Sequence, residues 1–258
     1  WEAKGMLPSR PMLQVVHAWA VCLARGPRAA GPLLDRLEQM QDAAPLIQAH
    51  RRAMRPLLLV LSDRTDEAMP LTASLLAELP TPVGFVQGFL EVVLANLAMI
   101  AGQYHEALRL ADAARSRQPE RASSFNLALS EAAEGAVDLT QGRLRKAIAH
   151  LKLAVSAGAS EVSRATNGNA MAGVLLAEAL YEADQCEQAE RLLTVYIPLI
   201  RAVGIPDQLI IAHTVMARIA AQRGDMHRAQ QLLAELEHVG HRDGLARVVA
   251  SARPVSSA

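Results

Sequence analysis

Apolar residues fall into stretches of helical length along the chain, and several of these stretches run into a glycine followed by polar residues. The clearest cases are three similar segments, Gly102 to Ala107, Gly142 to Ala147 and Gly224 to Ala229, in which an alanine follows the glycine after five positions. The same frame, with Gly or Asp first and a small residue five positions later, begins at Gly26, Asp63 and Asp184. These six turns recur every 37 to 42 residues, which indicates an internal repeat.

Each turn has the residues that a helical hairpin needs. Gly, and less readily Asp, adopts the left-handed conformation that ends one helix and lets the next begin. A small residue five positions later lets the second helix approach the first closely. Seven positions before the turn the residue is also small in four repeats, at Ala95, Gly135, Ala177 and Ala217. Trp19 and Pro56 hold this position in the first two repeats, so we expect those hairpins to be less regular.

Prolines separate successive hairpins, at Pro45, Pro80, Pro82, Pro119 and Pro206, because proline interrupts a helix and restricts the residue before it. The pattern predicts first helices near 11–25, 46–62, 84–101, 124–141, 163–183 and 206–223, and second helices near 28–42, 66–78, 104–117, 144–157, 186–202 and 226–239. The hairpins then span 11–42, 46–78, 84–117, 124–157, 163–202 and 206–239 of a single repeat domain over 1–258, with 240–258 as a C-terminal helix or linker. Ser156 to Asn169 is longer than the other connections, and Thr166 to Asn169 within it suits a loop or cap.

The composition favours an all-α fold. Hydrophobic residues make up 51% of the 258 residues, enough for a continuous core, whereas aromatic residues make up only 3%. Leu, Ala, Val, Ile and Met must therefore fill the core, and they suit closely packed helices. A generic helical bundle without a regular repeat is the alternative.

Charge and the length of apolar runs argue against nucleic acid and membrane partners, and the cysteine spacing argues against a disulfide framework. Lys plus Arg and Asp plus Glu each total 26, so no overall field attracts the chain to nucleic acid or an anionic membrane. Clean apolar runs such as 57–61 are too short to span a membrane. Cys22 and Cys186 are far apart in sequence, as expected for reduced thiols in a cytoplasmic protein. The chain opens at Trp1 without a signal peptide, and we expect a domain taken from a longer protein.

The sequence predicts no catalytic centre, no metal site and no cofactor in this segment. The eight histidines are scattered, and His238 and His241, one helical turn apart, have no third ligand nearby. A phosphate-binding loop and the common hydrolase and metalloprotease motifs are missing from the sequence. Glu178 and His213 form the pair to inspect for an enzymatic alternative. The basic segment from His50 to Arg55 is interpreted as a solvated or salt-bridged helix start rather than a phosphate contact.

Stacked hairpins place their first helices along a concave surface, which predicts a binding groove. The inward positions, counted back from each turn, are apolar in the third and fourth repeats and polar in the fifth and sixth. Such a groove suits a small amphipathic effector or a peptide. The predicted groove residues are Phe89, Asn96, Met99, Glu178, Tyr181, Arg218 and Gln222. Among them, Asn96, Glu178, Tyr181 and Arg218 are expected to make the polar contacts, and Phe89 and Met99 to pack against the ligand.

The small-residue pattern around each turn resembles the tetratricopeptide repeat, whose usual period is 34 residues. It implies a right-handed superhelical solenoid of about six helical hairpins. The segments Val174 to Asp184, Glu187 to Leu193, Ala217 to Gly224 and Gly244 to Arg247 further resemble the sensor region of large LuxR-type, MalT-like transcriptional activators. In that family an ATPase module precedes the repeats and a DNA-binding helix-turn-helix follows them, so ATP is expected only in a module outside this segment.

The resemblance implies an effector-sensing and oligomerisation domain, without catalysis and without direct nucleic acid or membrane contact, that self-associates in the full-length protein. A small-molecule inducer in the groove would shift the superhelix between two arrangements. The few aromatic residues along the groove make a sugar inducer less suitable. The alternative function is a general protein-protein interaction scaffold that holds a peptide or helix.

Overall fold

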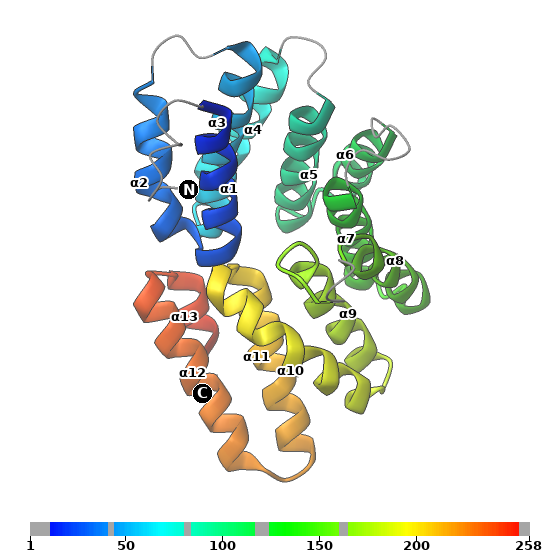
Figure 1. The fold of residues 1–258 in the computed structure, drawn as a ribbon. Helices are drawn as coiled ribbons and strands as arrows, with labels where there is room; N and C mark the ends of the chain where they lie inside the picture. The colour runs from blue at the N-terminus through cyan, green and yellow to red at the C-terminus, as the bar shows by residue number, and fades with distance from the viewer. Residues whose placement is uncertain (1–10, 41–43, 80–83, 117–123, 160–164, 253–258) are drawn as a thin grey trace.

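The computed structural model describes residues 11–40, 44–79, 84–116, 124–159 and 165–252, and these residues contain thirteen α-helices and no strand (Figure 1). The first six helices are α1 (Pro11–Arg25), α2 (Pro27–Glu38), α3 (Pro45–Leu61), α4 (Thr65–Glu78), α5 (Gly84–Ile100) and α6 (Tyr104–Ser116). The others are α7 (Ser124–Thr140), α8 (Leu144–Ala157), α9 (Ala170–Glu182), α10 (Cys186–Val203), α11 (Pro206–Gln222), α12 (Met226–Asp243) and α13 (Ala246–Ala252). The all-α prediction is confirmed.

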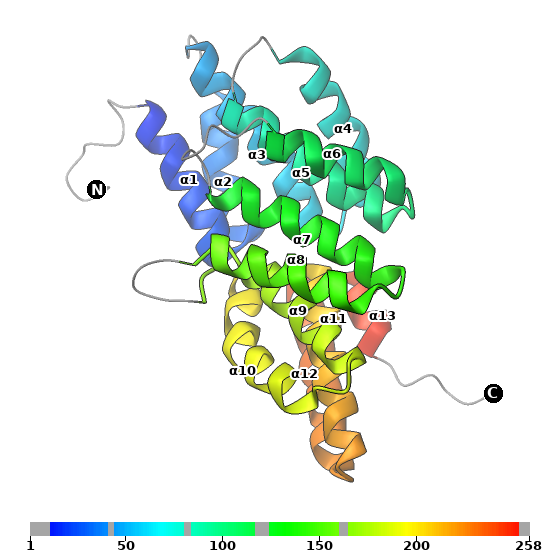
Figure 2. The same ribbon diagram turned by 90° about the vertical axis from the view of Figure 1, so that its right-hand side faces the viewer.

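The helices pair into six antiparallel hairpins, from α1/α2 to α11/α12, and α13 packs against α11 and α12. Each first helix contacts the first helix of the next hairpin, so α1, α3, α5, α7, α9 and α11 form one continuous layer, called here the first-helix row. Figure 2 shows the hairpins stacked along the molecule, with α7 and α8 between the earlier and later repeats. This is the solenoid that the repeat pattern predicted.

All six predicted turn residues have a positive φ, including Asp63 at 61° and Asp184 at 60°. In five of the turns the residue after the turn residue donates its amide to a carbonyl five positions earlier, as Gln103 does to Ala98 at 2.8 Å. This bond belongs to the helix-ending motif that a left-handed residue makes possible. The local chemistry of Gly and Asp therefore sets the place of each turn.

The small residues predicted to pack between the helices do so in five repeats. Ala68, Ala107, Ala147, Ala189 and Ala229 are all buried. The first hairpin differs, because α2 starts directly after Gly26, one residue earlier than in the other turns. Ala30 is buried there instead, and the predicted Gly31 has no neighbour within 4 Å of the place where a side chain would begin.

Three helix boundaries differ from the predicted ones. Helix α9 begins at Ala170 rather than near 163, because Asn169 donates its side-chain amide to Val155 O at 2.8 Å and Thr166 donates its hydroxyl to Gly158 O at 2.7 Å. These bonds hold 166–169 as a cap against the end of α8. Helix α2 ends at Glu38, short of the predicted 42. Helix α12 continues to Asp243, because Gly240 lets α13 pack closely against it.

Some sequence predictions fall outside the described residues, and others can be placed only in part. Pro80, Pro82 and Pro119, expected to separate hairpins, lie outside, as do 163 and 164 of the predicted fifth first helix and 253–258 of the C-terminal segment. Of the expected C-terminal helix or linker, α13 occupies 246–252. In the described part of the chain, no helix is both long and apolar enough to cross a membrane.

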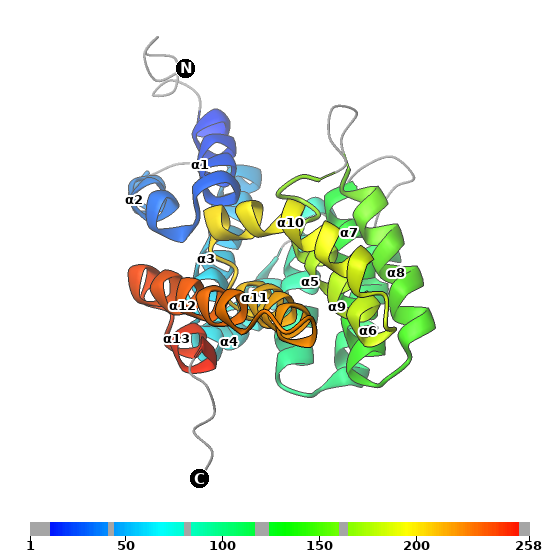
Figure 3. The same cartoon turned by 90° about the horizontal axis from the view of Figure 1, so that it is seen from below.

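The solenoid closes on itself, which the sequence did not predict. Helix α1 contacts α10, and the α1–α2 turn lies against the end of α10, where the Val203 carbonyl would be 2.5 Å from a Cβ at Gly26. Arg247 of α13 forms ion pairs with Asp63, in the α3–α4 turn, and with Asp207 of α11, the latter at 2.7 Å. Figures 1 and 3 show α12 and α13 beside the first two hairpins.

Candidate ligand-binding site

The N-terminal half of the first-helix row has an aromatic cluster. Trp19 of α1, Phe85 and Phe89 of α5 and Phe125 of α7 have neighbouring ring centroids 4.8 to 6.5 Å apart, and His50 of α3 stacks on Phe85 at 5.8 Å. Only 1% of Phe89 is exposed, whereas Phe85 is 37% exposed. In this conformation Phe89 therefore packs against protein, and its contact with a ligand stays a prediction.

Asn96 and Met99 both lie on α5, two hairpins away from the polar groove residues of α9 and three away from those of α11. The half-buried Asn96 donates its side-chain amide to Val92 O at 2.9 Å, so this amide is used within its own helix. Met99 is half-buried against the core that includes Ala98 and Val137. Their predicted ligand contacts remain predictions.

The predicted polar residues other than Asn96 lie on two helices that contact each other, α9 and α11. Arg218 Nη1 lies 4.0 Å from Glu182 Oε1, and Gln222 donates to the Tyr181 hydroxyl at 3.1 Å. Repeat geometry explains the arrangement, because Glu178 and Arg218 hold equivalent positions six residues before their turns, in helices that contact each other. We call Glu178, Tyr181, Glu182, Arg218 and Gln222 the polar face.

The polar face combines accessible charges with one perturbed acid. Arg218 and Glu182 have side chains 58% and 48% exposed, so both are accessible to a ligand. The pKa of Glu178 is raised to about 7, mainly by burial and also by the nearby Glu182 carboxylate, while Arg218 opposes the shift. A carboxyl group that titrates near neutral pH is common at binding and catalytic sites. The polar face is therefore the candidate site.

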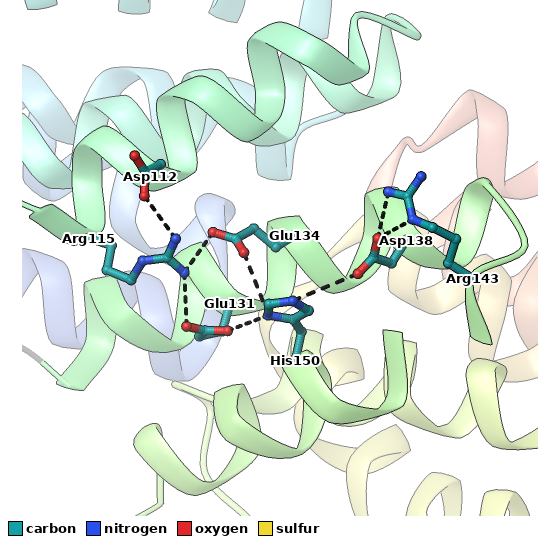
Figure 4. A network of polar contacts seen from close by, with 7 residues as sticks. All are labelled: Asp112, Arg115, Glu131, Glu134, Asp138, Arg143 and His150. Atoms are coloured by element: carbon teal, nitrogen blue, oxygen red, sulfur yellow. Dashed lines mark hydrogen bonds and ion pairs between the residues drawn. The ribbon is translucent and has the colours of Figure 1, made fainter. Parts of the chain in front are cut away.

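A second polar cluster joins α6, α7 and α8 (Figure 4). Arg115 Nη1 of α6 lies 3.2 Å from Glu131 and 2.8 Å from Glu134 of α7, and His150 Nδ1 of α8 lies 2.7 Å from the other oxygen of Glu131. Four further contacts complete the cluster: Arg115 with Asp112 at 2.9 Å, His150 Nδ1 with Glu134 at 3.6 Å, His150 Nε2 with Asp138 at 3.8 Å and Arg143 with Asp138 at 2.6 Å. The sequence analysis missed this cluster, although Glu131, Glu134 and Asp138 are spaced to share one face of α7.

This cluster has side chains that could bind a metal ion, but its charges are already paired. One ligand atom each from Glu131, Glu134 and His150 lies within 4.8 Å of the others, and these residue types bind divalent metals. The Arg115 guanidinium, however, already places a positive charge against both carboxylates. Burial raises the pKa of Glu134. We interpret the cluster as a structural link between three helices.

The pair considered for enzymatic chemistry does not form in this structure. His213 is fully buried on α11, where its Nδ1 donates to Leu209 O at 2.8 Å and its Nε2 faces Arg201 at 2.9 Å. Burial lowers the pKa of His213, which favours the neutral ring. The contacts of His213 run toward α10, whereas Glu178 lies beside Glu182 on α9.

The basic segment on α3 is used for packing between hairpins. Arg51 donates to Leu37 O at 2.7 Å, and Arg52 pairs with Glu78 at 2.6 Å. Arg55 forms ion pairs with Asp35 at 3.2 Å and with Glu38. The salt-bridged interpretation is confirmed, but the segment lies in the middle of α3 and not at a helix start.

Comparison with solved structures assigns the class of the fold. The structure of a Rap protein complexed with Competence and Sporulation Factor superposes with a TM-score of 0.62 at 11% sequence identity, covering 93% of this chain and 68% of that one. At this identity the likeness concerns the fold alone. The protein is of the tetratricopeptide-like helical repeat class.

The family follows from the sequence comparisons. The model of the MalT-like TPR region matches residues 49–256, and the chain belongs to this family. The serine/threonine-protein kinases PknK of Mycobacterium tuberculosis and Mycobacterium bovis are each 27% identical over 253 residues, which is 95% of this chain. The chain spans only 23% of the length of these relatives.

Proposed function

We propose that this chain is a non-catalytic sensing domain that binds a small-molecule effector at the polar face of α9 and α11. The observation that carries the proposal is the polar face itself. It has an accessible arginine, two carboxylates, a tyrosine hydroxyl and an amide on two adjacent first helices. In contrast, the aromatic cluster at the other end of the row is largely packed against protein.

The charges of the polar face favour a polar effector with both donor and acceptor groups. The guanidinium of Arg218 binds carboxylate or carbonyl oxygens, while Glu182 accepts hydrogen bonds from hydroxyl or amino groups. Glu178, with a pKa of about 7, can donate or accept a proton near neutral pH. Such a site holds a ligand without providing a nucleophile or a metal centre.

The family gives the wider context of the proposal. In a LuxR-type, MalT-like regulator, effector binding to the repeats would bias ATP-dependent self-association and so transcription, with the ATPase and DNA-binding modules outside these residues. In proteins organised like the mycobacterial relatives, the regulated module would be the kinase that their name describes. Both cases assign the repeats the same task in a cytoplasmic protein, namely to convert ligand occupancy into a change of shape.

A peptide ligand is the second candidate. The structurally similar Rap protein is described as complexed with Competence and Sporulation Factor, and first-helix rows of repeats can hold an extended or helical segment. A peptide would use the half-exposed Phe85 as well as the polar face. A peptide would therefore protect a longer part of the first-helix row from hydrogen exchange than a small molecule would.

A thermal-shift screen against metabolite and peptide libraries tests the proposal, because a ligand selective for the folded state raises the unfolding midpoint. We expect a saturable metabolite hit whose affinity falls about tenfold or more in Arg218→Gln, as for loss of a charged hydrogen bond. Arg64→Gln is the matched control, since Arg64, the N-cap residue of α4, is 56% exposed and among the described residues forms an ion pair only with Glu67.

The libraries also distinguish the alternatives. Hits confined to peptides, with protection that extends to Phe85, would replace the effector with a peptide partner. A metabolite that binds Arg218→Gln as tightly as the unchanged chain would contradict the proposed site.

A further inference from the structure

A cavity of about 520 Å³ lies where the solenoid closes. Its walls come from four parts of the chain that are distant in sequence: the α1–α2 turn, the end of α3, the end of α10 and the α12–α13 turn. The volume is in the range of sites that bind small organic molecules. No wall of this cavity belongs to the polar face on α9 and α11.

Positive charge predominates in this cavity. Four arginines line it, Arg25, Arg28, Arg201 and Arg242, against the single carboxylate of Asp243. Asp243 is paired with Arg242 and lies 3.7 Å from Arg28, so its charge is already neutralised. Outside the cavity, Glu235 pairs with Arg201. At the closure, the ion pairs of Arg247 with Asp63 and Asp207 leave one negative charge in excess. These two negative charges are fewer than the three cavity arginines other than Arg242.

Two of these arginines have unused hydrogen-bonding capacity. Arg25 makes no ion pair with any residue that the structure describes, and it is exposed. Arg201 pairs with Glu235 and contacts His213, yet its Nε is buried without a hydrogen-bond partner. The Nε has almost no accessible surface, so a ligand in the cavity would contact the exposed part of the Arg201 side chain, which is 34% exposed, rather than this atom.

From these observations we infer that the closure cavity is a binding site for a small organic anion bearing a phosphate or carboxylate group. Guanidinium groups hold such groups through paired hydrogen bonds and stay charged at every physiological pH. Leu61, Val203 and Leu245 supply apolar wall for the organic part of the ligand. This inference goes beyond the proposed function, because it concerns a different site.

The position of the cavity gives the anion a defined effect on the protein. Arg25 and Arg28 belong to the first hairpin, whereas Arg201 and Arg242 belong to the fifth and sixth. Asp243 bridges Arg28 and Arg242 across the closure, but no carboxylate among the residues that line the cavity joins Arg25 to Arg201. An anion that contacts both groups binds only when the ends meet, so it stabilises the closed solenoid.

The test measures binding of glucose 6-phosphate, 3-phosphoglycerate, citrate and inorganic phosphate by thermal shift and calorimetry at constant ionic strength. Uncharged glucose serves as the matched probe. We expect at least one organic anion to raise the midpoint saturably, glucose to have no effect, and Arg25→Gln/Arg28→Gln to weaken binding at least tenfold. The control double variant Arg145→Gln/Arg191→Gln removes two exposed arginines that do not line the cavity.

If the phosphate esters bind and citrate does not, the site recognises phosphate groups. If citrate binds and the phosphate esters do not, it recognises carboxylates. No saturable shift from any probe, or equal binding to both double variants, would overturn the inference. Binding lost in Arg218→Gln but kept in Arg25→Gln/Arg28→Gln would overturn it too, because the anion would then occupy the polar face. Loss of anion binding in Arg25→Gln/Arg28→Gln alone would support the cavity site. The polar face would then be tested separately, by the screen described under the proposed function.

Discussion

At the scale of single residues, the turns were predictable because they depend on local backbone chemistry. Asp63 and Asp184 adopt the left-handed conformation just as the glycines in the equivalent turns do. Gly31 was misplaced because α2 starts one residue early, a detail that the spacing of small residues does not reveal. Within the candidate site, the repeat spacing was enough to predict that Glu178 and Arg218 hold equivalent positions in adjacent repeats. The burial of Phe89 depends on aromatic rings from other hairpins, so it could not be predicted.

Glu178 gives a prediction about pH at this scale. Its pKa in the folded chain is about 7, above the ordinary value of 4.5, so the folded state binds the proton more tightly than the unfolded state. The resulting stability is present at pH 4 to 5 and is lost as the pH rises through 7. Between pH 5 and 8 we expect the unchanged chain to lose about 1–2 kcal/mol of its free energy of unfolding through Glu178, and Glu178→Gln not to show this loss.

Urea unfolding at pH 5 and pH 8 measures the effect. Glu187→Gln, at an exposed position on α10, is the control and should unfold with the pH dependence of the unchanged chain. An unaltered pH dependence in Glu178→Gln would show that the carboxyl group is not desolvated as described.

At the scale of helices, the sequence predicted most boundaries because apolar periodicity and prolines mark them. It missed the start of α9, where the side chains of Thr166 and Asn169 bond to α8. It also missed the cluster around His150, since side chains from three helices meet there and none of them forms a motif along the chain. Contacts of this kind depend on how neighbouring hairpins are rotated against each other.

The link between α6 and α7 can be tested with two arginines of one helix. Arg115→Met leaves Glu131 and Glu134 buried without their cation, which we expect to lower the free energy of unfolding by about 2–4 kcal/mol. Arg109→Met, the control, removes a 59% exposed arginine whose one ion pair within the described part of the chain is with Glu106, and should change the free energy of unfolding by less than about 1 kcal/mol. Chemical denaturation compares the two variants, and equal effects would mean that the buried cluster does not hold the helices together.

At the scale of the whole molecule, closure of the solenoid could not be predicted from the sequence. It depends on the sum of small rotations between six hairpins, and each rotation is set by packing. The closure rests on identifiable contacts, such as the ion pairs of Arg247 and the approach of Gly26 to Val203. The family match and the repeat class agree with the predicted sensor region, whereas ligand and regulated module remain proposals.

Alanine substitutions at two glycine turns distinguish the effect of closure from the effect of backbone strain. Gly26→Ala and Gly102→Ala both place alanine at a positive φ, of 78° and 74°. The cost is about 1–2 kcal/mol at a left-handed position and higher at Gly26, whose ψ of −178° is essentially confined to glycine. Only at Gly26 would the new Cβ meet a backbone atom, the Val203 carbonyl at 2.5 Å. We therefore expect Gly26→Ala alone to enlarge the radius of gyration in small-angle scattering. The same radius in both variants would argue against closure in solution.

The most direct test of the sensing function is hydrogen exchange of the chain with and without the strongest metabolite from the screen. The proposal predicts slower exchange in α9 and α11, over 170–182 and 206–222, and loss of that protection in Arg218→Gln. Protection confined to other helices, or unchanged in Arg218→Gln, would contradict a binding site at the polar face.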